Sequence, residues 1–302
     1  MILRAILLMI LSMALLSGSD AFFKLATSTA PVGQAMALVS LGGTLLFIAL
    51  SRARGVTLIT RDALHPMMLL RNGFEMIAAI GLVTGIANVS LPVFAAIMQT
   101  GPLVVTIGAA LFLKEHIGPR RWAAVAAGIL GMLLVIRPWS SAFTGWELFA
   151  VIGVTALSCR DLVTRLSPPH IPALAISTWG FAVPLPAGLA LWWASDAPSD
   201  WSTGALWAIG GAVVVTALGY LAITTAMRMA PASVVAPFRY ARLVFTTSLG
   251  MLFFGDRPDA MTYLGAAIIL VAGLYTFFRE HVLARSARST PIGATMTPPK
   301  MR

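Results

Sequence analysis

Ten stretches of mainly apolar residues run along the chain, separated by short connections rich in Gly, Pro, Ser or charged residues. Each holds about 20 residues, which at ~1.5 Å rise per residue spans a bilayer core of ~30 Å. They cover roughly residues 3–23, 31–51, 67–87, 91–113, 121–138, 146–167, 172–193, 204–228, 232–254 and 260–278. The pattern predicts an all-α integral membrane protein with ten transmembrane helices. The polar, basic segment 281–302 is expected to be a disordered cytoplasmic tail.

A shift of 141 residues superimposes the chain on itself. It carries Leu16, Ser17, Asp20 and Lys24 onto Leu157, Ser158, Asp161 and Arg165, and Thr106, Phe112 and Glu115 onto Thr247, Phe253 and Asp256. Similarity at one fixed offset indicates a duplicated unit. We therefore predict two five-helix repeats, residues 1–141 and 142–280. Because five is odd, the second repeat is inverted in the membrane relative to the first.

Composition supports the membrane prediction. Hydrophobic residues make up 58% of the chain and charged residues 11%, and the mean hydropathy is +0.88. Soluble domains carry about 25% charged residues. The net charge of +10 is better explained by basic cytoplasmic loops than by a nucleic-acid partner. A single cysteine, Cys159, excludes an internal disulfide, and no cluster of metal ligands is visible.

The distribution of basic residues predicts the orientation. They gather on alternate connections, namely at Arg4, Arg52, Arg54, Arg61, Lys114, Arg120, Arg121, Arg165, Arg228 and the C-terminal segment, whereas the other side holds Lys24, Arg137 and Arg257. The positive-inside rule then places both termini in the cytoplasm of a cell with the protein in its inner membrane. The connection 114–121 is net positive and its repeat counterpart 255–259 is net negative, as an inverted repeat requires.

The N-terminus imitates a secretory signal peptide, with Arg4 before an apolar run that ends near Ser17-Gly18-Ser19. Residues 14–31 are, however, the counterpart of residues 155–172 inside the chain. We therefore expect a retained first helix.

Several motifs occur once in each repeat. The first copies are Gln99-Thr100-Gly101-Pro102-Leu103, Phe112-Leu113-Lys114-Glu115 and the glycines Gly128 and Gly131, and the second copies are at Arg242-Leu243, at Phe253-Phe254-Gly255-Asp256 and at Gly265 and Gly273. This set resembles the EamA family of the drug/metabolite transporter superfamily. The resemblance covers residues 3–280 and implies a ten-helix secondary transporter. Members of this family move amino acids, riboflavin, S-adenosylmethionine, other metabolites or drugs. The segments 237–240 and 255–259 are similar to the branch with riboflavin and S-adenosylmethionine carriers.

Charged residues within the predicted helices are the first candidates for function. Insertion scales put their cost at about 2.5–3.5 kcal/mol each near a helix centre. Arg71 and Glu75 are four residues apart and can pair with each other. Alternatively, Glu75 lines the substrate cavity or carries a proton.

Two matching acid–base pairs, Asp20 with Lys24 and Asp161 with Arg165, lie near helix ends of the two repeats. They are either a structural clasp inherited from the ancestral unit or symmetric gates at opposite membrane faces. The residues expected in ion pairs or gates are Asp20, Lys24, Arg71, Arg160, Asp161 and Arg165.

Arg239 and Arg242 lie one-third to halfway across the membrane, beside the helix-breaking Pro237. They either pair with Asp161 and Glu75 or hold an anionic group of the substrate, because a guanidinium matches a carboxylate. Polar or aromatic residues near the midplane complete the expected substrate-binding set of Glu75, Gln99, Trp179, Arg239, Tyr240 and Arg242.

These patterns favour a secondary transporter over other classes. There is no Walker-type phosphate loop, and the four histidines lie in loops or the tail, without a catalytic motif. A membrane enzyme or a non-transporting scaffold is therefore disfavoured. The predicted substrate is a small organic metabolite, with riboflavin or a similar aromatic or anionic compound as the best guess and S-adenosylmethionine or an amino acid as the alternative. The expected partners are this substrate and membrane lipid, with no nucleic acid, metal or cofactor; a homodimer is compatible with the pattern, but a monomer suffices.

Overall fold

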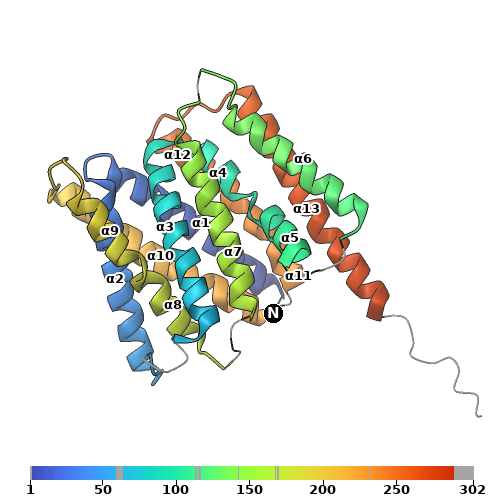
Figure 1. The fold of residues 1–302 in the computed structure, drawn as a ribbon, viewed down its shortest axis with the longest axis horizontal. Helices are drawn as coiled ribbons and strands as arrows, with labels where there is room; N and C mark the ends of the chain where they lie inside the picture. The colour runs from blue at the N-terminus through green and yellow to red at the C-terminus, as the bar shows by residue number, and fades with distance from the viewer. Residues whose placement is uncertain are drawn as a thin grey trace, which may run out of the picture.

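A computed structural model describes residues 2–58, 64–112, 114, 117–141, 143–166, 168, 170–230 and 232–288, and this part of the chain contains helices and no strand (Figure 1). The helices are α1 (Ile2–Thr27), α2 (Val32–Ala53), α3 (Pro66–Asn88), α4 (Leu91–Met98), α5 (Gly101–Phe112), α6 (Pro119–Ile136), α7 (Glu147–Leu166), α8 (Ala173–Ala182), α9 (Pro184–Trp193), α10 (Thr203–Met229), α11 (Ala232–Val235), the 3₁₀ helix η2 (Ala236–Tyr240), α12 (Ala241–Phe253) and α13 (Ala260–Arg288). The all-α prediction is confirmed.

Three of the ten predicted spans are interrupted. α4 is separated from α5 at residues 99–100, α8 from α9 at Val183, and η2 lies between α11 and α12. A proline follows or occupies each break, at Pro102, Pro184 and Pro237, and proline lacks the N–H that would continue the helical hydrogen bonds. With the α4–α5 and α8–α9 spans each counted once, seven helical segments of the described chain are long and apolar enough to cross a membrane.

The other three spans fall short of that criterion for visible reasons. α7 carries charged residues including Arg160 and Asp161, the span from α11 to α12 is broken by η2, and the described apolar part of α13 is Ala260–Thr276. The tail boundary expected at residue 281 is too early. α13 continues to Arg288, because residues 279–288 contain neither Pro nor Gly and include good helix formers; residues 289–302 lie outside the described residues.

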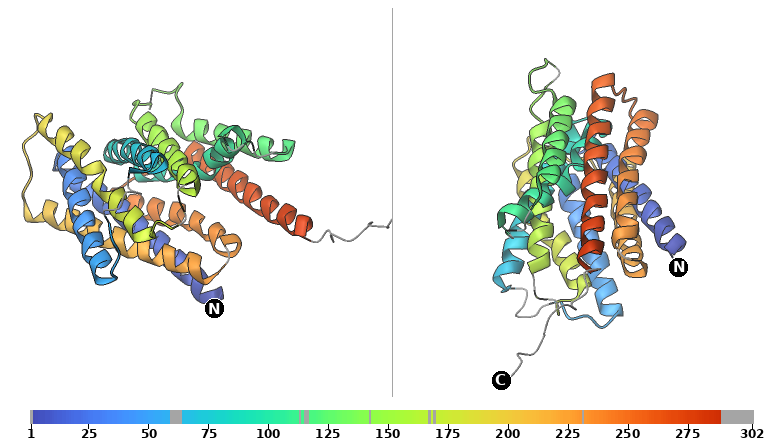
Figure 2. Two further views of the ribbon diagram at one scale, coloured as in Figure 1. Left: turned by 60° about the horizontal axis from the view of Figure 1, so that its bottom comes forward. Right: turned by 90° about the vertical axis from the view of Figure 1, so that its right-hand side faces the viewer.

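The helices pack in a pattern that the repeat explains. α1 packs along α10 and its counterpart α7 packs along α3, whereas α6 packs on its own counterpart α13 (Figures 1 and 2). One hydrogen bond occurs in both halves. The Ser17 hydroxyl donates to the Arg242 carbonyl oxygen at 3.3 Å, and the Ser158 hydroxyl donates to the Gly101 carbonyl oxygen at 3.2 Å. Both partners of each bond are related by the 141-residue shift.

At each end of the bundle, a helix residue contacts a connection that the sequence predicts to lie on the same side of the membrane. At the predicted external end, the Gln34 side chain exchanges two hydrogen bonds with the backbone of Asp200, at 2.7 and 2.9 Å. At the opposite end, the Trp179 indole donates to the Leu58 carbonyl oxygen at 3.2 Å. The spans thus alternate in direction.

The buried apolar core is larger toward the predicted external end. A cluster there joins α1–α4, α6, α7 and α10 and includes Phe23, Ile86, Leu91, Phe94 and Ile136. A smaller cluster toward the other end joins α1, α10 and α11 and includes Ala5, Met9, Met13, Ala226 and Val235. More helices are therefore held together by apolar packing at the predicted external end.

Candidate functional site

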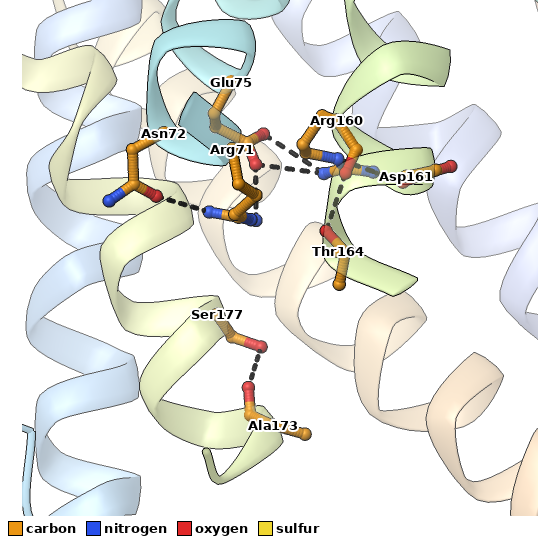
Figure 3. Close-up of polar contacts among 8 residues, drawn as sticks. All are labelled: Arg71, Asn72, Glu75, Arg160, Asp161, Thr164, Ala173 and Ser177. Carbon is orange, nitrogen blue, oxygen red and sulfur yellow. Dashed lines mark hydrogen bonds and ion pairs between the residues drawn. The ribbon is translucent and has the colours of Figure 1, made fainter. Parts of the chain in front are cut away.

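A four-residue ion-pair network connects α3 to α7 (Figure 3). The Arg71 guanidinium binds the Glu75 carboxylate at 2.6 Å, which confirms the expected pair, and Asn72 accepts a hydrogen bond from Arg71 at 2.9 Å. Arg160 of α7 reaches across to Glu75 at 3.1 Å and also binds Asp161 at 2.6 Å. The network contains two acids and two arginines, so its formal charges cancel.

The second buried ion pair differs from the predicted one. Asp20 binds Arg242 of α12 through both carboxylate oxygens, each 2.8 Å from Nη2 of Arg242. The expected pairing of Asp20 with Lys24 is therefore wrong. A guanidinium facing the carboxylate makes two directed bonds that a single ammonium does not make. Arg242, expected to bind substrate, is occupied by a protein carboxylate.

The side chain of Lys24, on α1, instead contacts the C-terminal end of α3. Its ammonium donates to the carbonyl oxygens of Ile86 at 3.2 Å and of Val89. Asp256 accepts a hydrogen bond from the backbone N–H of Leu91, the first residue of α4, at 2.9 Å. A cation at a helix C-terminus and an anion at the next N-terminus both complement the helix dipoles. We call Lys24 and Asp256 the α3–α4 clasp.

The counterparts of Asp20 and Lys24 in the second repeat, Asp161 and Arg165, are only partly described. The Asp161 carboxylate binds Arg160, its neighbour in sequence, and the Arg165 side chain lies outside the described residues. The Asp161 side chain is 44% exposed, compared with 11% for its counterpart Asp20. The two matching acids thus have different surroundings.

Two of the three interrupted spans, α4–α5 and α11–α12, meet at the pseudo-two-fold axis. The Gln99 amide, in the break between α4 and α5, donates to the carbonyl oxygens of Arg239 at 3.5 Å and Tyr240 at 3.4 Å, next to the break before α12. Gln99 and Tyr240 are 141 residues apart and are repeat equivalents. A residue that contacts its own counterpart must lie close to the axis that relates the two repeats. Gln99 therefore binds the backbone carbonyl groups of the opposite break.

The Arg239 guanidinium is the charged side chain of this region without a described hydrogen-bond or ion-pair partner; only the backbone carbonyl of this residue accepts a bond, from Gln99. The Arg239 side chain has accessible surface, although it lies among the helices deep in the bundle and its neighbour Tyr240 is buried. The charged groups near enough to act on it are Asp161, which attracts it, and Arg242 and Arg160, which repel it. Because Arg242 is neutralised by Asp20 and Arg160 shares two acids, one positive charge remains on Arg239.

The remaining predicted site residues take structural positions. The hydroxyl of Tyr240 is buried against Gly273 of α13, where a Cβ would lie 1.8 Å from it, and it has no described hydrogen-bond partner. The Trp179 indole is bound to the α2–α3 connection through Leu58. Of the expected substrate-binding set, Glu75 therefore lies in the ion-pair network, and Arg239 lies near its members Arg160 and Asp161.

An aromatic cluster beside the network was missed from the sequence. Phe47 stacks on Phe181 with ring centroids 5.3 Å apart and meets Tyr220 edge-on at 5.8 Å. Gly180 precedes Phe181, and a Cβ at this glycine would lie 3.2 Å from the Arg71 guanidinium. The glycine thus lets α8 approach the network. Single apolar residues on different helices give no sequence signal that they meet.

Within the described residues no group of three His, Cys, Asp or Glu side chains could hold a metal ion. The arrangement consists of paired charges, one unpaired guanidinium and aromatic rings. It can bind a polar organic molecule by hydrogen bonds and ring contacts, and it contains no arrangement of nucleophile and base.

Comparison with known proteins agrees with this description. Residues 3–137 and 144–278 each match the EamA-like transporter family. A riboflavin transporter of Rhizobium johnstonii is 34% identical over 211 residues, or 68% of each chain. The pseudopaline exporter CntI of Pseudomonas aeruginosa is 30% identical over 275 residues, covering 88% of this chain and 93% of that relative. An S-adenosylmethionine uptake transporter of Rickettsia felis is 27% identical over 183 residues, covering 59% of this chain and 60% of the relative.

A solved structure aligns with a TM-score of 0.62 at 18% identity, covering 94% of this chain and 99% of that one, and shows a shared fold. The protein is thus a multi-pass membrane transporter of a small metabolite and not an enzyme. With both repeats matched, the chain belongs to the EamA-like transporter family.

Proposed function

We propose that this protein is a secondary transporter in the inner membrane for an aromatic metabolite with a polar or anionic group, and that riboflavin is its substrate. The observation that carries the proposal is the exposed Arg239, which has no described partner and lies among charges that otherwise cancel. The carbonyl oxygens of a flavin ring or a carboxylate would accept its hydrogen bonds.

The surroundings of Arg239 suit such a substrate. Asp161 and Arg160 are partly exposed, with side chains 44% and 22% accessible, so they offer further polar contacts. The rings of Phe181 and Tyr220 both pack on Phe47, and Gly180, next to Phe181, approaches Arg71 of the ion-pair network. Aromatic rings near these charges favour a flat molecule. Three riboflavin transporters are among the curated relatives, which agrees with this chemistry.

A zwitterionic substrate is the alternative, and the exposed carboxylate of Asp161 favours it. Asp161 would hold an ammonium or sulfonium group while Arg239 holds a carboxylate, as S-adenosylmethionine or an amino acid would require. The direction of transport also differs between relatives, since one is named an uptake transporter and another an exporter.

A substrate panel in proteoliposomes tests the proposal. The purified protein is loaded with unlabelled riboflavin, and counterflow of labelled riboflavin is measured with excess S-adenosylmethionine, riboflavin 5′-phosphate or a neutral amino acid outside. We expect riboflavin counterflow, with competition by the flavin phosphate and none by the amino acid. A second set of vesicles is loaded with S-adenosylmethionine and assayed with the labelled compound. Counterflow of S-adenosylmethionine without that of riboflavin would favour the zwitterion, and counterflow of neither would overturn both assignments.

We also infer that the α3–α4 clasp is part of a gate, in place of the predicted Asp20–Lys24 pair. Lys24 and Asp256 hold the end of the bundle where the larger apolar core lies. A cysteine at Ser90, in the turn between α3 and α4, should react faster with a membrane-impermeant thiol reagent in Lys24→Met than in the parent. Equal rates would remove the clasp from the gate.

The same labelling from outside intact cells tests the proposed external position of this turn and the cytoplasmic termini.

A further inference from the structure

The outer surface of α6 and α13 carries a groove that is separate from the charged site. It encloses about 510 Å³ and is lined by one face of each helix, with Ala123, Ala127 and Val271 among the lining residues. The two helices lie together at one edge of the bundle (Figures 1 and 2). In a membrane-spanning protein this edge faces lipid, and Val271 is 66% exposed there.

The shape of the groove follows from where the helices touch. α6 and α13 approach closely at Gly131 and Gly265, where a Cβ on either residue would lie 2.8 Å or less from the carbonyl oxygen of the other. From this crossing toward the start of α6, alanines occupy the facing positions, including Ala123, Ala124 and Ala127. Small side chains on both helices leave space that bulkier residues would fill.

The polar residues of the groove gather at one end. Arg120 lies in the first turn of α6 and Tyr275 lies in the part of the antiparallel α13 that passes it. Arg120 is exposed, and no hydrogen bond or ion pair links it to another described residue. The groove thus has an apolar body and a basic mouth, the distribution of an anionic amphiphile.

We propose that this groove binds one anionic phospholipid, with an acyl chain along the alanines and the headgroup phosphate at the Arg120 guanidinium and the Tyr275 hydroxyl. A guanidinium matches phosphate oxygens, and basic pockets between membrane helices bind such headgroups. A second copy of the chain fits less well, because none of the groove-lining residues is acidic and could pair with Arg120.

Native mass spectrometry of the purified full-length protein tests the proposal, with phosphatidylglycerol or phosphatidylcholine added in detergent. We expect Arg120→Gln to lower retention of phosphatidylglycerol about fivefold, because each basic residue near the membrane surface strengthens binding of an anionic lipid by about that factor. Retention of phosphatidylcholine should not change. Ala127→Leu fills the groove and should lower retention of both lipids. Arg52→Gln is the matched control, since Arg52 is exposed on α2 at the same end of the bundle and should have no effect.

The outcomes separate the alternatives. Equal losses in Arg120→Gln and Arg52→Gln, or equal retention of the two lipids by the parent protein, would overturn the site. A dimer that dissociates in Ala127→Leu while lipid retention is unchanged would assign the groove to a second copy instead. Thermal unfolding of each variant checks folding, and Ala123→Leu replaces Ala127→Leu if the latter fails to fold.

Discussion

The contact between α3 and α7 and the contact between α1 and α10 are repeat equivalents with different chemistry. In the first, Arg160 binds Glu75 across the helices. In the second, the equivalent residues are Ser19 and Thr216, and their hydroxyl groups hydrogen-bond to each other. Both contacts join one repeat to the other, but only the contact between α3 and α7 carries charge at these positions.

The difference also affects the matching acids. Asp20 faces Arg242, whereas the residue equivalent to Arg242 opposite Asp161 is Gly101. Asp20 is therefore neutralised from another helix, while Asp161 depends on its neighbour Arg160 and remains accessible. The two repeats therefore share a scaffold, whereas the charged residues at equivalent positions differ between them.

The largest expected effect comes from breaking the ion pair between Asp20 and Arg242, which has no counterpart at the equivalent Asp161 and Gly101. Arg242→Ala leaves the Asp20 carboxylate without its partner, with a side chain only 11% exposed. Removing one member of a buried pair costs about 3–5 kcal/mol. We expect a large drop in the unfolding midpoint measured in detergent.

The double variant Asp20→Asn, Arg242→Gln separates charge from packing. It removes both charges and retains polar side chains, so most of the stability lost in Arg242→Ala should return. If the double variant is as unstable as Arg242→Ala, the loss comes from packing around Arg242 and not from the unpaired carboxylate.

A smaller effect tests the part of the comparison that is symmetric. Ser17→Ala and Ser158→Ala each remove the hydrogen bond to a repeat-equivalent carbonyl group. Such bonds in membrane proteins contribute about 0.6 kcal/mol on average, up to about 1.7. The second bond of each serine differs: Ser158 donates to the Val154 carbonyl oxygen of its own helix at 2.8 Å, whereas Ser17 accepts a bond from Thr246 of α12 at 2.8 Å. Because loss of Ser17 also removes the partner of a buried hydroxyl on another helix, it should cost more. Chemical denaturation of the two variants measures the difference, and a larger loss in Ser158→Ala would contradict this ranking.

The smallest effect lies at the connection before α13. Hydrogen bonds from Thr262 and Arg137 lower the pKa of Asp259 to about 2. A lowered pKa stabilises the folded state above the ordinary pKa of about 3.9, and this stabilisation disappears as the pH falls toward 2. The unfolding midpoints of the parent and Asp259→Asn should therefore converge between pH 4 and pH 2. A difference that is constant with pH would show that the ionised form contributes nothing.

The sequence predicted the scaffold well because its signals are local or periodic. Apolar length located the spans, and the 141-residue shift identified the equivalence that Ser17 and Ser158 display. The interruptions were only partly foreseen, through the helix-breaking Pro237. Helix ends could be placed within a few residues, except for the end of α13, which was predicted at residue 278 and lies at Arg288.

The partners of the charged residues could not be predicted in the same way. Asp20 and Lys24 are four residues apart and suggested a local pair, but Arg242 lies 222 residues from Asp20 in sequence and beside it in space. Which helix faces which depends on the packing of the whole bundle. The pair of Arg71 and Glu75 was predicted correctly because the two residues lie one turn apart on the same helix.

The most direct test of the account replaces Arg239 with the residue that the other repeat has at the equivalent position, Met98. Because Arg239 has no described partner, Arg239→Met should leave the unfolding midpoint unchanged. Riboflavin counterflow should fall about tenfold to a hundredfold, the value of a hydrogen bond to a charged group, and Arg239→Lys should retain part of it. Parent-like counterflow by Arg239→Met would contradict the claim that the unpaired charge of one repeat binds the substrate.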